Sequence, residues 1–185
     1  MIADIITEAE LKMDSAVEYA KEEFAAIRTG RAHPAMFNKI TAEYYGTATP
    51  LQQLASFQVP DARMVLITPY DTSAMSAIER AIRDSDLGVN PSNDGKSIRV
   101  TLPQLTEDRR KEYIKLAKTK AEEARVSVRG ARRAAKDALD KLVKDKEAGE
   151  DEVVRAEKQL DAATKKHTDQ IDEVLKGKEA ELLEV

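Results

Sequence analysis

The sequence predicts an α+β fold in which a long, antiparallel, coiled-coil-like three-helix bundle carries an inserted small β/α/β domain on a two-strand hinge. Three stretches repeat small or apolar residues in alternating steps of three and four, which is the heptad spacing of packed helices. Between the first and second stretches the period changes, and short β-branched or aromatic runs alternate with turn formers. This pattern assigns residues 1–29 and 106–185 to the bundle and residues 30–105 to the inserted domain.

The composition is that of a helical rod and not of an enzyme with a broad core. Of the 185 residues, 42% are hydrophobic and 35% are charged, whereas only 4% are aromatic. The chain has no Cys, which excludes disulfides, thiolate zinc sites and thiol catalysis. It also lacks the pattern of a signal peptide and any apolar run of membrane-spanning length. We therefore expect a cytoplasmic protein without a membrane segment.

The first helix is predicted to run from the N-terminus to about Arg28. Its apolar positions are Ile2, Ile6, Ala9, Met13, Ala16, Ala20 and Ile27, and Val17 and Phe24 widen this apolar side of the helix. After this helix, Gly30 is expected to supply the positive φ of a C-cap, and Pro34 is expected to prevent an immediate restart.

The inserted domain is predicted to contain five strands and one helix. The strands are expected at residues 37–45, 54–59, 64–68, 89–91 and 97–102, between turns rich in Gly, Pro, Asn and Asp. Capping residues at 71–73 precede the helix, whose apolar positions are Met75, Ile78, Ala81 and Ile82.

The second and third helices are predicted to form an antiparallel pair. The second helix starts at a Thr106 cap and runs to about Lys146, with its seam at Ile114, Ala117, Ala121, Ala124, Val128, Ala131, Ala135, Ala138 and Leu142. A short turn at residues 147–149 leads to the third seam, which contains Val153, Ala156, Leu160, Ala163, His167, Ile171, Val174 and Leu182. A connection this short forces the two helices to run in opposite directions.

A row of basic residues flanks the seam of the second helix. It follows the same spacing and is basic at every position but one, with the members Lys111, Lys115, Lys118, Glu122, Arg125, Arg129, Arg132 and Lys136. At the helical rise per residue the row spans about 37 Å, which is long enough to meet several phosphates. Residues 106–146 carry 14 basic and 8 acidic side chains, although the whole chain has a net charge of −4.

Two interpretations of this row remain open at the level of the sequence. The basic side chains can pair with the acidic first and third helices through interhelical salt bridges. Alternatively, they bind a polyanion, because arginine at positions 125, 129, 132 and 133 presents a planar fork that suits phosphate oxygens. No aromatic residue is interleaved with the row, so stacking on the bases of a single strand is not expected. The row instead favours structured RNA, which it would contact through the phosphate backbone.

The sequence offers no constellation that points to catalysis. Of the two histidines, His33 lies in the expected hinge, and His167 is interpreted as a packing or salt-bridging residue because no second ligand stands three or four residues away. Ser73 and Ser76 have no His base nearby and stand where a helix cap needs hydroxyls. No glycine-rich phosphate loop appears. We expect a protein that is not an enzyme and that needs no metal or cofactor.

Several motifs in a fixed order resemble the ribosome recycling factor family over the whole chain. They are Ile27–Ala32, Tyr44–Gly46, Asn93–Lys96, Ile98–Val100, Leu102–Glu107, Arg109–Arg110, Ala124–Val126, Val128–Arg129 and Arg132–Arg133. The family fold, a three-helix bundle with a smaller hinged domain, agrees with the outline above. Gly130 and His33 depart from the residues common in the family.

The resemblance implies a function in protein biosynthesis after translation termination. It implies a factor that binds the post-termination ribosome and, with elongation factor G and GTP, splits it into subunits so that mRNA and tRNA are released. The bundle is then expected to contact large-subunit ribosomal RNA, and the smaller domain to meet elongation factor G. We also expect the chain to be a monomer.

The resemblance implies RNA-binding and hinge roles for the residues of this chain that match the family motifs. The residues expected to bind RNA are Arg129, Arg132, Arg133, Arg125, Arg110, Arg28, Arg31, Lys118 and Lys136. For Arg28, Arg31 and Arg110 the alternative is packing in the hinge or a salt bridge between the domains. The hinge itself is expected in two short Gly- and Pro-containing linkers, at Thr29, Gly30, Arg31, Pro34, Leu102, Pro103 and Gln104.

A rival hypothesis from another class is a coiled-coil scaffold or chaperone whose basic row recognises an acidic protein. Ribosome pelleting that is disrupted by competing RNA, but not by an acidic protein, would favour the ribosomal role.

Overall fold

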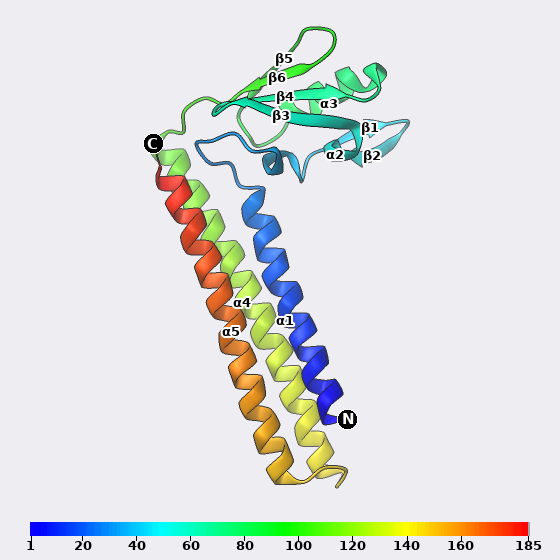
Figure 1. Cartoon of the computed structure of the whole chain (residues 1–185), viewed down its shortest axis with the longest axis vertical. Coiled ribbons are helices and arrows are strands. Elements are labelled where there is room, and N and C mark those ends of the chain that lie inside the picture. The colour runs from blue at the N-terminus through cyan, green and yellow to red at the C-terminus, as the bar shows by residue number, and fades with distance from the viewer. Residues whose placement is uncertain (185) are drawn as a thin grey trace. The chain divides into compact units, whose positions relative to one another are not determined.

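The computed structural model describes residues 1–184 and has the predicted α+β architecture, with long helices and a small β-containing part (Figure 1). The chain divides into two compact units. Unit 1 contains residues 1–24 and 114–180, and unit 2 contains residues 25–113 together with the C-terminal residues from Glu181 onward.

Unit 1 is built from three helices, α1 (Ile2–Ala25), α4 (Glu107–Lys144) and α5 (Glu150–Leu183), each of which ends or begins within unit 2. Their polar contacts give the helix directions. On α1, Tyr19 contacts Glu123 of α4, while Glu23 contacts Lys120, so residue numbers rise along one helix as they fall along the other. The predicted antiparallel bundle is therefore confirmed (Figure 1).

The predicted heptad seams are the buried positions of the bundle, with a few shifts. On α4 the buried residues are Ala117, Ala121, Ala124, Val128, Ala131, Ala135, Leu139 and Leu142. Leu139, which is 0% exposed, takes the place predicted for Ala138, because the 3.6-residue period of a helix drifts from a strict heptad. On α5 the buried Lys178 stands between Val174 and Leu182.

His167 occupies its predicted seam position on α5 and is 3% exposed. Its Nε2 lies 2.6 Å from Oδ1 of Asp14 on α1, and its Nδ1 lies 2.6 Å from the carbonyl oxygen of Ala163. The expectation that this histidine packs and pairs inside the bundle is confirmed. The ring connects α1 to α5 at a level where most of the core is aliphatic.

Unit 2 contains a four-stranded antiparallel sheet in the order β3-β4-β6-β5, and a separate two-stranded sheet, β1-β2. The strands are β1 (Thr41–Tyr44), β2 (Thr47–Pro50), β3 (Ala55–Asp61), β4 (Met64–Pro69), β5 (Asn90–Asn93) and β6 (Ile98–Thr101). The helices are η1 (Pro34–Phe37), α2 (Leu51–Leu54), η2 (Thr72–Ala74) and α3 (Met75–Arg83). The core of unit 2 includes Phe37, Leu51, Ile67, Ile78, Ile82 and Ile98, all 0% exposed.

Three local predictions around residues 25–50 are wrong. The first helix ends at Ala25, and the φ of Gly30 is not positive, because this glycine stands five positions beyond the helix end and caps nothing. Pro34 does not prevent a restart but opens η1, since His33 caps it by accepting a 3.0 Å bond from the Ala35 N–H at Nδ1. The strand predicted from residue 37 therefore begins only at Thr41.

A polar contact ties β1 to the start of η2. The hydroxyl of Tyr44 donates to Oδ2 of Asp71 over 2.7 Å, while the other carboxylate oxygen accepts the Ser73 N–H and caps η2, as predicted. The bond to Asp71 is the main reason why the pKa of Tyr44 rises from 10.0 to about 12. The same bond, together with the backbone N–H of Ser73, lowers the pKa of Asp71.

This contact predicts a specific pH dependence for the variant Tyr44→Phe. Because folding raises the pKa of Tyr44, its bond to Asp71 contributes its full stabilisation below pH 10.0. This contribution is lost as the pH rises through about 12 and the hydroxyl ionises. We therefore expect wild type to exceed Tyr44→Phe in urea midpoint at pH 8, and the gap to narrow at pH 12. A gap that stays constant over this range would contradict the assignment.

Candidate nucleic-acid interface

The basic helix α4 begins where the sequence predicts. The hydroxyl of Thr106 accepts the Arg109 N–H over 3.1 Å and caps the helix, and Glu107 and Asp108 stand in its first turn. Carboxylates at this end of a helix complement its dipole. The cap fixes the helical phase of every basic residue that follows, because the helix is continuous to Lys144.

The basic row of α4 divides into two sets with different surroundings. Measured by helical phase, Arg125 and Arg132 lie next to the buried seam, whereas Lys118, Arg129, Arg133 and Lys136 lie further around the helix. Exposure agrees with this division, since the first two are partly buried and the other four are exposed. We call the second set the outer basic row.

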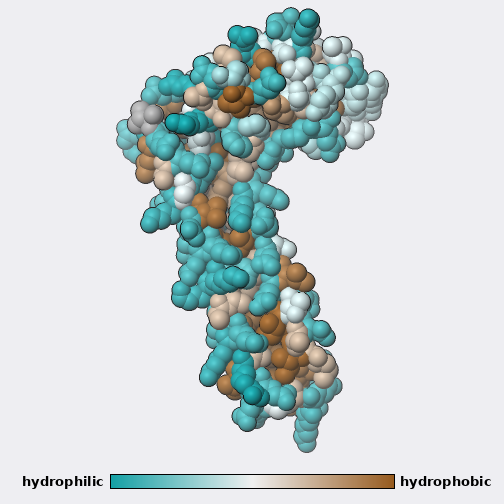
Figure 2. All heavy atoms as spheres, viewed as in Figure 1, coloured by the Kyte–Doolittle hydropathy of each residue, from teal (hydrophilic) through white to brown (hydrophobic). Residues whose placement is uncertain are grey.

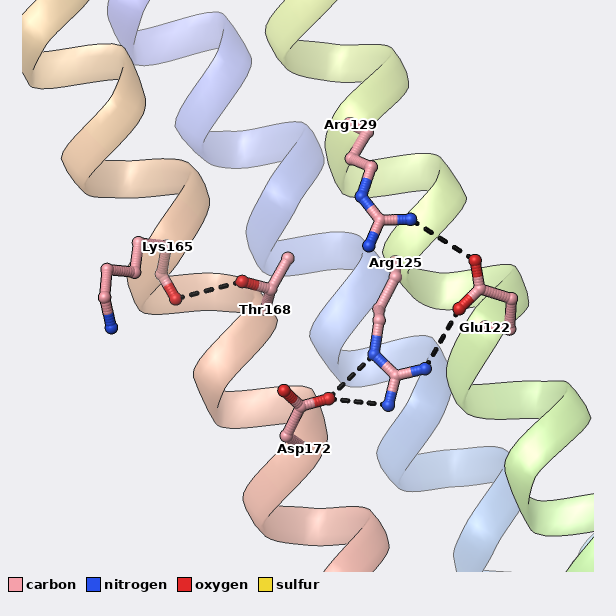
Figure 3. A network of polar contacts seen from close by, with 6 residues as sticks. All are labelled: Glu122, Arg125, Arg129, Lys165, Thr168 and Asp172. Carbon is pink, nitrogen blue, oxygen red and sulfur yellow. Dashed lines mark hydrogen bonds and ion pairs between the residues drawn. The ribbon is translucent and has the colours of Figure 1, made fainter.

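Arg125 is held by carboxylates on two helices (Figure 3). Its Nε and one terminal nitrogen lie 2.7 and 2.6 Å from Oδ1 of Asp172 on α5, and its other terminal nitrogen donates to Glu122 over 3.1 Å. Only 19% of the side chain is exposed. Burial alone would lower the pKa of Arg125, but the bonds to Asp172 and Glu122 outweigh it, so this pKa lies above its ordinary value.

Arg132 is tied less completely than Arg125. Its Nε donates to Oδ1 of Asp161 on α5 over 2.7 Å, and 38% of the side chain is exposed. Because this bond runs through Nε, the terminal nitrogens can still donate to an outside ligand. Arg132 is therefore both a bundle contact and a candidate ligand contact.

The outer basic row is free of other helices. Among the described residues, Arg129 pairs only with Glu122 of its own helix, at 3.3 Å, and its side chain is 54% exposed (Figure 3). Within residues 1–184, no ion pair engages Lys118, Arg133 or Lys136. Pairing with exposed carboxylates such as Glu122 contributes little to stability. These four cations can thus meet an anionic ligand without first breaking an interhelical contact.

The structure bears on the two interpretations differently for different residues. Arg125, expected to bind RNA, is instead a bundle residue paired with Asp172, and Arg132 is so in part through Asp161, whereas polyanion binding by the exposed residues stays a prediction. The physical reason is position: side chains adjacent to a narrow seam reach across to the neighbouring helix. Arg129 and Arg133 lie further around the helix and are exposed.

Arg28 lies inside unit 2 and is 5% exposed. Its terminal nitrogens donate to two backbone carbonyls, that of Leu87 at 3.3 Å and that of Pro103. Burial lowers the pKa of Arg28, and the like charges of Arg109 and Arg63 lower it further. Arg28 therefore packs in this structure and offers no surface for RNA, which is the alternative the sequence left open.

Arg31 and Arg110, which the sequence analysis grouped with Arg28, are more accessible than Arg28. Arg31 is exposed, and both its backbone N–H and its carbonyl bond to the hydroxyl of Thr29. Arg110 is half-buried, and its Nε has no hydrogen-bond partner among the described residues. Sequence reasoning missed Arg63, which follows β3 and adds its charge to this group. Its position after a predicted strand gave no signal of proximity to Arg28.

The expected hinge residues lie in two segments that bond to the β3-β4 turn. The Ala32 N–H donates to Ala62 over 2.7 Å, and the N–H of the buried Leu102 donates to Arg63 over 2.7 Å. Pro103 accepts from Arg28, while Gln104 is exposed. The linkers are thus anchored by a few backbone bonds at their ends.

The described residues hold no cluster of three or more His, Asp or Glu side chains placed to bind a metal ion. Over the same residues, no helix combines the length and the apolar character that crossing a membrane requires.

A family model described as ribosome recycling factor matches residues 20–183. The ribosome-recycling factors of Kineococcus radiotolerans and Streptomyces avermitilis are 69% and 68% identical to this chain, over 185 residues and 100% of both chains in each case. A solved structure described as the solution structure of the ribosome recycling factor has a TM-score of 0.78 at 43% identity, covering 100% of this chain and 98% of that one. Another, described as models for the T. thermophilus ribosome recycling factor and the E. coli elongation factor G bound to the E. coli post-termination complex, has a TM-score of 0.70 at 40% identity over 100% of both chains.

We expect substitution by alanine to lower the free energy of unfolding by different amounts in the two sets of arginines. Arg125→Ala removes a partly buried interhelical ion pair and leaves Asp172 unpaired, so the free energy of unfolding should fall by about 1–2 kcal/mol. Arg133→Ala is the matched control on the same helix and should change it by less than about 0.5 kcal/mol. Urea unfolding followed by circular dichroism measures both. Equal losses in the two variants would show that the division of the row is not real.

Proposed function

Because the chain belongs to the ribosome recycling factor family, we propose that it is a translation factor that binds the post-termination ribosome. With elongation factor G and GTP, it splits this ribosome into subunits and releases mRNA and tRNA. The observation that carries the proposal is the match of the family model to residues 20–183, together with relatives that align over the whole chain. The structural neighbour described with elongation factor G on a post-termination complex supports the choice of partner.

The outer basic row is the surface that we assign to large-subunit ribosomal RNA. Lys118, Arg129, Arg133 and Lys136 recur along one exposed side of α4, and Arg132 adds its terminal nitrogens at the edge of that side. Cations at helical spacing match a run of phosphates, and each neutralised phosphate releases counterions. We also assign RNA contacts to Arg110, near the start of α4, and to the exposed Arg31, whereas the buried Arg28 is left out of the assignment.

The mechanism we assign to the chain is mechanical. The bundle, residues 1–29 and 106–185, docks on RNA, and the inserted domain, residues 30–105, is pushed through a hinge at the two linkers. GTP hydrolysis by elongation factor G supplies the energy, so this chain makes and breaks no covalent bond and acts as a cytoplasmic monomer. The linkers support the assignment, because each is short and is held by few backbone bonds.

The proposal predicts both activity and its electrostatic basis. The purified chain should split post-termination ribosomes when elongation factor G and GTP are present, measured by light scattering. Arg129→Ala and Arg133→Ala should each weaken ribosome binding and reduce the slope of log affinity against log salt by about 1. Melting temperatures should stay nearly constant, because neither side chain contacts another helix.

Arg80→Ala is the matched control for these variants, since Arg80 is an exposed arginine on α3 of unit 2. It should leave both affinity and salt slope unchanged. Competition resolves the rival function: RNA should release the chain from ribosomes, whereas an acidic protein should not. Unchanged ribosome binding by a double variant of Arg129 and Arg133 would remove the RNA assignment from α4.

A second prediction concerns the hinge at Gly30. A Cβ placed on Gly30 would meet the carbonyl oxygen of Glu184 at 3.7 Å, an ordinary contact, so Gly30→Ala should behave like wild type. Gly30→Pro fixes φ and restricts Thr29, so it should leave ribosome binding intact while abolishing subunit splitting. Stopped-flow light scattering compares the two variants. Normal splitting by Gly30→Pro would refute a hinge at this linker.

A further inference from the structure

Arg125 and Arg132 of α4 make unequal use of their carboxylate partners on α5. They stand seven residues apart and therefore have nearly the same helical phase. Arg125 uses all the nitrogens of its guanidinium, since Asp172 pairs with Nε and one terminal nitrogen and Glu122 accepts from the other (Figure 3). Among the described residues, Arg132 bonds through Nε alone, to Oδ1 of Asp161 over 2.7 Å. Asp161 thus holds only one edge of its arginine.

Exposed ion pairs are common in unit 1 and do not by themselves indicate a role. Figure 2 shows hydrophilic side chains along much of the bundle, and exposed pairs such as Lys165–Asp169 occur within one helix. The pair of Arg132 and Asp161 is itself exposed, at 38% and 57% of the two side chains, so it contributes little to the stability of the bundle. What this pair does determine is the direction of a guanidinium next to the outer basic row.

The bond through Nε orients the part of Arg132 that stays free. A guanidinium is planar and presents its N–H donors as a rigid fork, so an anchored Nε restricts where both terminal nitrogens point. Among the described residues, no hydrogen bond engages either terminal nitrogen of Arg132. Two parallel N–H groups on one edge match two oxygens of one phosphate. Arg132 therefore offers an oriented phosphate fork beside the bundle seam.

The cations on either side of Arg132 belong to the outer basic row. Arg129 and Lys136 stand three residues before it and four residues after it, and residues at these separations are neighbours on a helix surface. Both are exposed, and neither pairs with another helix among the described residues. A phosphate drawn to these two cations would reach the free edge of Arg132. The carboxylate of Asp161 lies close by, where its charge would repel that phosphate.

We propose that Asp161 is a positioning residue for RNA binding, which holds the guanidinium of Arg132 with both terminal nitrogens turned toward a phosphate. The inference rests on the proposed function and adds to it a residue that is not itself a cation. An arginine that binds a phosphate loses rotamer freedom, and prior orientation by Asp161 reduces that loss. The negative charge of Asp161 acts in the opposite direction. Orientation and charge therefore predict opposite changes in affinity when Asp161 is replaced.

Two substitutions separate orientation from charge. Asp161→Asn and Asp161→Ala both remove the negative charge, but only asparagine keeps an oxygen that accepts from Nε of Arg132. Asp161→Asn should bind purified ribosomes at least as tightly as wild type. Asp161→Ala should bind them about three- to tenfold more weakly than Asp161→Asn, because the arginine must then be ordered on binding. Pelleting titrations of the full chain at one fixed salt concentration measure both. Equal affinities, or tighter binding by Asp161→Ala, would overturn the proposal.

A second background tests whether Asp161 acts through Arg132. In chains that also carry Arg132→Ala, the difference in ribosome affinity between Asp161→Asn and Asp161→Ala should disappear, because no guanidinium is left to orient. A difference that persists in this background would show a merely structural role for Asp161 and would refute the positioning role.

Asp172→Ala is the matched control on the same helix. It removes the α5 carboxylate from Arg125, whose side chain is only 19% exposed, so it should lower the urea midpoint of unfolding without weakening ribosome binding. A fall in affinity as large as that of Asp161→Ala would contradict the assignment to Asp161. Failure of wild type to bind ribosomes would instead refute the proposed function, so the two failures are distinguishable.

Discussion

The narrow seam of α4 is the constraint on which the rest of unit 1 depends. Five of its eight buried residues are alanine, and they lie at Ala117, Ala121, Ala124, Ala131 and Ala135. Small side chains let neighbouring helices approach closely, so long side chains next to the seam reach the next helix and those further around it cannot. A seam of large residues would hold the helices further apart and leave Arg125 unable to meet Asp172 at the distances observed.

This constraint gives one row of cations two physical roles. Beside the seam, Arg125 contributes to the register between α4 and α5, and its carboxylate partners shield it from other ligands. Further around, Arg133 has no interhelical partner among the described residues and keeps its full charge for an outside anion. Arg132 lies between these limits, since one nitrogen serves the bundle while the others stay available. Bundle stability and the proposed RNA binding thus involve different members of the same row.

Unit 2 uses different chemistry from unit 1. Arg28 is buried, and its guanidinium bonds to backbone carbonyls of two separate segments, which joins the chain after α1 to the segment before α4. This arginine of unit 2 is thus used for packing, whereas the outer basic row of unit 1 keeps four exposed cations.

The sequence by itself determined the three heptad seams, the cap at Thr106, the antiparallel course of α4 and α5, and the family, because these depend on local spacing and order. It also contained a clue to the Arg125–Asp172 pair, since the two residues stand at similar distances before and after the turn near residue 147. Only the tertiary structure decided which arginines remain free, that Arg28 is buried, and that Gly30 caps no helix. These outcomes depend on contacts between residues far apart in the chain, which no local pattern encodes.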